Sequence, residues 1–228
     1  MKKISTVELI LLFTIGSIIG FIVETIFCLF KNGRFESRKG LVYGPFSQVY
    51  GFGAVLLTIT LSRLADRGFL TLFVASAILG GVYEALCSFW QEKTFGTVSW
   101  EYSKKSIPLF GGRTCLFYML FWGVMGAVYI RLIHPVLFGL IRGVSPLIST
   151  PVAVLLALFL FYDLSLSMLA VDRWQNRVRG VAPAQKLDEW LDRRFPNERM
   201  KRIYPNMVTV NSVAKPNSAK KAVYGEGA

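Results

Sequence analysis

Long apolar blocks separated by shorter polar stretches dominate the pattern of this chain. Each of five blocks is long enough to be interpreted as a membrane-spanning helix. The predicted spans cover about residues 7–30, 47–64, 69–90, 113–133 and 150–171. The stretch 134–149 is interrupted by prolines and is expected to lie along the membrane interface. The pattern therefore predicts an all-α integral membrane protein with about five transmembrane helices and long cytoplasmic loops.

The stretch RKGLVYGPFSQVYGFG, residues 38–53, lies where the first two predicted spans are joined. It is rich in glycine and aromatic residues, and glycine permits both positive φ and close backbone approach. We expect a folded loop at the membrane surface. The alternative is a membrane re-entry whose aromatic residues anchor at the headgroups. The candidate backbone positions are Gly40, Gly44, Pro45, Gly51 and Gly53, and the candidate substrate contacts are Tyr43 and Tyr50.

Three acidic residues, Glu24, Glu84 and Asp163, fall inside predicted spans. Charged residues at such depth are costly and are candidates for function. Each lies roughly six to nine residues from the predicted cytoplasmic end of its span, which is about 9–13 Å of helix. Arg113 begins the fourth span from the same side. These residues predict a polar pocket open to the cytoplasm, and the alternative is a structural ion-pair cluster that locks the helices together.

A second long polar loop, residues 91–112, contains the sequence Trp100-Glu101-Tyr102. At a membrane surface these side chains are typical of an aromatic anchor, and they could equally contact a substrate.

The chain also suggests an internal repeat, because a shift of about sixty residues aligns Gly20 with Gly80 and Glu24 with Glu84. Each unit would consist of a span with an intramembrane glutamate, a long loop and a returning span. The hypothesis is thus two tandem two-helix repeats followed by a fifth helix.

Charge modifies this picture at the C-terminal end. The chain has 26 Lys and Arg against 14 Asp and Glu, a formal net charge of +12. The basic residues flank apolar blocks, which is typical of membrane orientation and anionic-lipid binding rather than of nucleic-acid binding. We therefore divide the chain into a transmembrane domain (1–171), a basic cytoplasmic segment (172–205) and a disordered tail (206–228). The N-terminus is then outside.

Within the basic segment, Leu187, Trp190, Leu191 and Phe195 share one face of a short amphipathic helix. We expect this face to lie on the inner leaflet or on a partner.

Few residues are suited to metal or cofactor chemistry. The three cysteines lack metal-site spacing, and His134 is the single histidine. We expect no metal and no cofactor. The sequence contains no GxxxxGK[ST] phosphate loop, so any dependence on ATP requires a separate ATPase subunit.

Several motifs occur in an order that resembles a known family. Residues 38–46 resemble its NRGFLxGP stretch, 49–53 its PIYGFG continuation, 100–103 its WDYS motif, 112–113 the end of its NxxGR step, and 122–123 a later WG. The family is the bacterial multi-pass membrane proteins called "putative ABC-transporter type IV" (CmpB-like). This resemblance implies a permease of the bacterial inner membrane.

Three classes of function are compatible with these observations. The leading hypothesis is a permease-like subunit for a small or amphiphilic substrate, acting as a homodimer or with a partner because five spans are few for a transporter. The second is an assembly or regulatory subunit without transport activity. The third is a membrane enzyme acting on lipid-linked substrates, with Glu84 or Glu101 as the acid–base group and Arg113 holding an anion.

Overall fold

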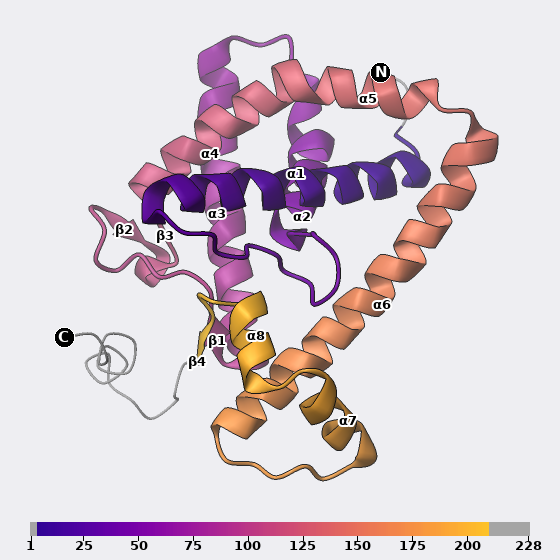
Figure 1. The fold of residues 1–228 in the computed structure, drawn as a ribbon. Helices are drawn as coiled ribbons and strands as arrows, with labels where there is room; N and C mark the ends of the chain where they lie inside the picture. The colour runs from indigo at the N-terminus through magenta and orange to yellow at the C-terminus, as the bar shows by residue number, and fades with distance from the viewer. Residues whose placement is uncertain (1–3, 210–228) are drawn as a thin grey trace.

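A computed structural model describes residues 4–209, and helices account for most of them (Figure 1). The helices are α1 (Thr6–Asn32), α2 (Gln48–Leu61), α3 (Phe69–Phe95), α4 (Leu116–Val128), α5 (His134–Gly143), α6 (Pro146–Val178), α7 (Lys186–Arg194) and α8 (Asn197–Ile203). The strands are β1 (Thr97–Val98), β2 (Pro108–Leu109), β3 (Thr114–Cys115) and β4 (Val208–Thr209). Strands β1 and β4 pair antiparallel, as do β2 and β3.

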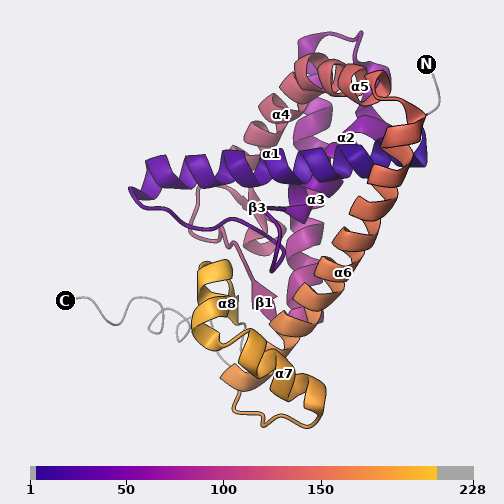
Figure 2. The same cartoon turned by 45° about the vertical axis from the view of Figure 1, so that its right-hand side comes forward.

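Four helical segments are long and apolar enough to cross a membrane, namely α1, α3, the continuous segment Leu116–Gly143, and α6. The second predicted span corresponds to the apolar segment Gln48–Leu64, which is shorter than these four. The prediction of an all-α membrane protein is therefore confirmed. The helices are not a parallel bundle, because α1 runs crosswise to α3 in both views (Figures 1 and 2).

Two tight helical hairpins, α1–α2 and α3–α4, form the centre of the fold. A Cβ atom at Gly20 would lie 2.2 Å from the Cβ of Tyr50, and one at Gly80 would lie 2.5 Å from the Trp122 ring. Since real Cβ atoms do not approach so closely, glycine at these positions lets the two helices of each hairpin pack together. The hairpins match the units proposed from the sequence, while the repeat itself stays a prediction.

The fourth span does not end where the sequence suggested. Helix α4 continues through a π-helical turn, Tyr129–Ile133, directly into α5. The backbone N–H of His134 donates to the carbonyl of Tyr129, and Pro135 follows immediately. The wider turn accommodates the proline, which lacks an N–H and would clash with a regular preceding turn. Helix α5 then crosses the upper end of the molecule towards α6 (Figure 1).

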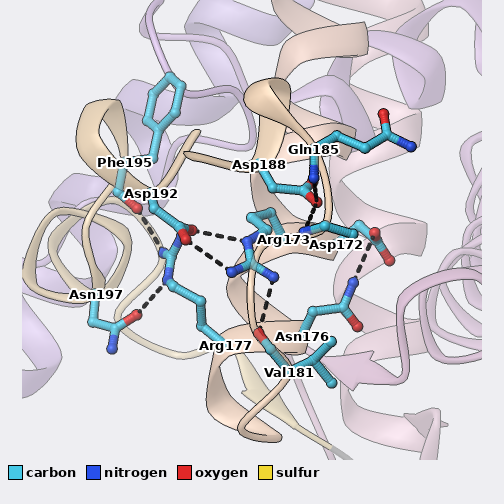
Figure 3. A network of polar contacts seen from close by, with 11 residues as sticks. Asp172, Arg173, Asn176, Arg177, Val181, Gln185, Asp188, Asp192, Phe195 and Asn197 are labelled. Atoms are coloured by element: carbon cyan, nitrogen blue, oxygen red, sulfur yellow. Dashed lines mark hydrogen bonds and ion pairs between the residues drawn. The ribbon is translucent and has the colours of Figure 1, made fainter. Parts of the chain in front are cut away.

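Helices α7 and α8 fold back on the end of α6 at the lower end of the molecule (Figure 1). The Asp192 carboxylate pairs with Arg173 at 2.8 Å and also with Arg177, as Figure 3 shows. Leu191 and Phe195 are buried against α6, whereas Leu187 and Trp190 are exposed. Half of the predicted face therefore packs on its own chain, and contact of the exposed half with the inner leaflet or a partner stays a prediction.

The predicted disordered tail began at residue 206, but Val208 and Thr209 pair with β1. The rest of that tail, 210–228, lies outside the described residues, as do residues 1–3.

Candidate functional site

Glu84 of α3 is the centre of a buried group of polar side chains between the two hairpins. One carboxylate oxygen accepts a 3.0 Å hydrogen bond from the Tyr102 hydroxyl, and the other accepts a 2.7 Å bond from Thr114 Oγ1. Only 8% of Glu84 is exposed. Tyr118 stacks on the Tyr102 ring with 4.5 Å between centroids, which fixes the direction of the phenol. Both oxygens of this carboxylate therefore have a partner.

Tyr50 of α2 connects Glu84 to the second glutamate. Its hydroxyl interacts with the carboxyl group of Glu24 in α1 and also lies within the electrostatic influence of the Glu84 carboxylate. The Tyr50 ring also stacks on Trp122 of α4, with 6.4 Å between centroids. We call Glu24, Tyr50, Glu84, Tyr102 and Thr114 the acid–tyrosine cluster. It combines side chains from both hairpins.

Arg38 forms an ion pair with Glu24, but it lies closer to another acid. The Arg38–Glu24 ion pair spans 3.9 Å, whereas Arg38 reaches Glu36 at 3.3 Å. Burial would raise the pKa of Glu36, but hydrogen bonding to Arg34 and the charge of Arg38 outweigh it and hold that pKa below its ordinary value. Glu36 thus keeps its negative charge and competes with Glu24 for Arg38.

The loop after α3 contributes Tyr102 in its protonated form. Burial and the neighbouring Glu84 carboxylate raise the pKa of Tyr102 above its ordinary value. Its hydroxyl therefore keeps its proton and can donate to Glu84. The loop owes its shape to Gly111 and Gly112, whose φ angles of +71° and +84° favour glycine.

Asp163 does not join this cluster. Its carboxylate accepts hydrogen bonds from the backbone N–H groups of Tyr43 at 3.2 Å and Gly44 at 3.0 Å. Ser167, one helical turn further along α6, accepts a 2.9 Å bond from the Val42 N–H. Asp163 is fully buried and holds the loop 33–47 against α6. The expectation that all three acids share one pocket was therefore wrong for Asp163.

Arg113 is also directed elsewhere. It pairs with Glu92, contacts Ser88 at 3.4 Å and lies over the Phe89 ring. The Trp100 indole N–H donates to the Arg113 carbonyl at 3.3 Å, and exposed Glu101 accepts a 2.8 Å bond from the N–H of Ser103. Of the three side chains 100–102, only Tyr102 bonds to an acid of the cluster.

None of the glycines within residues 38–53 has a positive φ angle. Their role is to let neighbouring side chains approach the backbone closely. A Cβ at Gly40 would meet the Gln48 side chain at 1.7 Å, and one at Gly44 would meet the Phe46 ring at 2.0 Å. Gly51 and Gly53, assigned to the loop from sequence, lie in the first turns of α2, and Pro45 is exposed. Tyr43 packs against Phe195 of the C-terminal segment and not near the cluster.

A comparison with protein families identifies the family of this chain. The family described as "Putative ABC-transporter type IV" matches residues 11–168, more than half of the chain. The chain belongs to this family. No curated protein and no solved structure matches it.

The matched region contains the whole acid–tyrosine cluster together with Asp163, so the family resemblance predicted from the motifs is confirmed. Sequence reasoning missed Thr114 as a member of the cluster and Tyr118 as the ring that stacks on Tyr102. Thr114 directly follows the Gly112-Arg113 motif, but nothing in the pattern indicated that its hydroxyl faces Glu84. The proximity of Ser167 to Asp163 could have been predicted from the sequence, because a spacing of four residues places both side chains on one helix face.

Proposed function

We propose that this protein is a permease-like membrane transport subunit for a small or amphiphilic substrate. The observation that carries the proposal is the unequal satisfaction of the two glutamates. Glu84 has a partner on each oxygen, whereas Glu24 is contacted by Tyr50, its side chain is 30% exposed and its ion pair with Arg38 is 3.9 Å long. A purely structural cluster would be expected to hold both acids in close ion pairs or hydrogen bonds, whereas Glu24 is partly open to a ligand.

Both long loops reach this polar centre. Arg38 of the first loop approaches Glu24, and Tyr102 of the second loop bonds to Glu84. A substrate with a cationic or hydrogen-bond-donating group would compete with Arg38 for Glu24. Movement of the loops would then alter access to the acids, as gating segments do in other proteins. Tyr43 and Trp100 act indirectly in this proposal, by holding the two loops in place.

The location and partners proposed for the subunit follow from charge and size. We place it in the bacterial inner membrane with the N-terminus outside and the C-terminus in the cytoplasm, because basic residues concentrate after α6. Anionic lipids are then neighbours of that basic segment. A homodimer would supply further spans, and a separate ATPase subunit would supply ATP hydrolysis, to this small membrane domain.

Uptake assays in a strain lacking the chromosomal copy test this proposal. The wild-type protein, Glu24→Gln and Glu84→Gln are expressed from a plasmid, and uptake of labelled cations and cationic amphiphiles is measured. Glu189→Gln is the matched control, since this exposed carboxylate of α7 lies outside the cluster.

We expect wild type and Glu189→Gln to restore uptake of at least one compound. Both cluster variants should fail to do so while they are inserted in the membrane at wild-type levels. If Glu24→Gln and Glu84→Gln transport as well as the wild type, the cluster is structural and the proposal is rejected.

A further inference from the structure

An apolar groove lies on the other side of α2 from the acid–tyrosine cluster. Its lining comes from one face of α1 within residues 6–13, of α2 within 48–55 and of α6 within 157–164, together with Leu41 of the first loop. Its volume is about 320 Å³. The three walls come from segments that cross or approach the hydrocarbon layer, so the medium around them is lipid.

We propose that this groove binds one hydrocarbon chain of a membrane lipid or other amphiphile. The lining is almost wholly apolar, with Thr6 and Gln48 as its polar members. The Gln48 amide is turned towards the loop, because its Nε2 donates to the Gly40 carbonyl. The surface offered to a ligand is therefore hydrocarbon, and apolar cavities of this kind do not hold water.

The surrounding medium indicates the occupant. The lining belongs to helices that cross or approach the hydrocarbon layer, where lipid chains are the solvent, so a hydrocarbon chain reaches the groove without any partner protein. A helix from a second copy is the alternative occupant, and the oligomeric mass measured below distinguishes the two. In residues 210–228, no apolar run is longer than three residues, and lysine, asparagine, serine and glycine separate the runs, so this sequence does not match an apolar lining.

The position of α6 explains why the groove needs an occupant. The polar ties of α6 to the first loop are made by Asp163 and Ser167, beside the loop end of the groove. Leu160 is already packed with Phe13 near those ties. The groove-lining rings of Phe52 and Phe161, in contrast, are exposed. An empty groove would forfeit the dispersion contacts of its walls, and a bound chain supplies them. The proposal is independent of the transport function proposed above.

Photolabelling of the purified full-length protein tests the inference. A diazirine-bearing fatty acid is added in mild detergent, the sample is irradiated, and labelled peptides are identified by mass spectrometry. Ala157→Trp fills the groove from the α6 wall. Leu158→Trp is the matched control, because Leu158 is the next residue of the same helix, is 63% exposed and does not line the groove.

We expect the label in wild type and Leu158→Trp to concentrate on the groove walls, and we expect Ala157→Trp to lose it. If Ala157→Trp does not elute as a folded protein, Leu9→Trp fills the groove from the α1 wall instead. Equal labelling in the filled variant and the control would overturn the inference. A change of oligomeric mass in Ala157→Trp without loss of label would also overturn it, because the groove would then face a second copy.

Discussion

The Asp163 carboxylate in α6 accepts a 3.0 Å hydrogen bond from the backbone N–H of Gly44, which lies 119 residues earlier in the chain. Together with Ser167 it satisfies three successive N–H groups of the first loop, those of Val42, Tyr43 and Gly44. Such consecutive N–H groups form a concavity that favours an anion. The shape of this loop therefore depends on a helix that is distant in sequence.

Replacing Asp163 with asparagine should destabilise the protein. An amide has one acceptor oxygen, so one of the two loop N–H groups is left buried and unpaired, at a cost of about 1–3 kcal/mol. We expect a lower melting temperature of the detergent-solubilised protein. Ser165→Ala is the control, because that exposed hydroxyl bonds only to the Phe161 carbonyl of its own helix and its loss should change little. Equal melting temperatures for Asp163→Asn and wild type would show that the carboxylate does not hold the loop.

Replacing Gly20 with alanine should separate the α1–α2 hairpin. The new methyl group would lie 2.2 Å from the Cβ of Tyr50, and overpacking of this kind costs about 1–3 kcal/mol. The melting temperature should fall, and uptake should fall with it because Tyr50 belongs to the acid–tyrosine cluster. Gly139→Ala provides the comparison, since no atom lies within 4 Å of a Cβ added there. A Gly20→Ala protein as stable as Gly139→Ala would contradict the close packing described for this hairpin.

The C-terminal segment should loosen in acid. Hydrogen bonding to Arg173 holds the pKa of Asp192 below its ordinary value of 3.8. Because the folded-state pKa is depressed, the stabilisation is fully present above pH 3.8 and is lost as the pH falls through that value towards the folded-state pKa. Limited proteolysis should therefore cleave α7 and α8 faster at pH 3 than at pH 6, with an acid-active protease.

Asp192→Asn should show the faster cleavage already at pH 6, since it cannot form the paired ion contacts with Arg173 and Arg177. Glu189→Gln is a control on the same helix, because the Glu189 carboxylate is exposed and the ion pairs of Arg173 and Arg177 are made with Asp192. Cleavage of Asp192→Asn at the wild-type rate would show that the ion pairs do not hold the segment.

Periodicity and burial cost made the helices and the two cluster glutamates predictable. Apolar blocks of spanning length reveal membrane helices, and a glutamate inside such a block is conspicuous because it is costly. Gly20 and Gly80, each four residues before a cluster glutamate, lie on the packed faces of α1 and α3. These signals depend on residues that are close to one another in the chain, so a single sequence is enough to recognise them.

The partners of those residues could not be predicted, because they depend on how distant segments meet. Asp163 looked like a pocket acid, and its true role as acceptor for loop N–H groups follows only from the return of α6 to the first loop. The same holds for Arg113, which pairs with Glu92 rather than with the intramembrane glutamates. That these acids fall inside apolar helices was readable from the sequence, whereas their equal distance from the helix ends and the direction of each side chain were not, since Asp163 lies 15 residues before the end of α6.

The most direct measurement is a double-mutant cycle for uptake with Glu24→Gln, Glu84→Gln and the double variant, each normalised to its level in the membrane. If Tyr50 joins the two glutamates into one functional unit, the double variant should be no worse than the more impaired single variant. Independent losses that multiply in the double variant would contradict this account, because each glutamate would then act by itself.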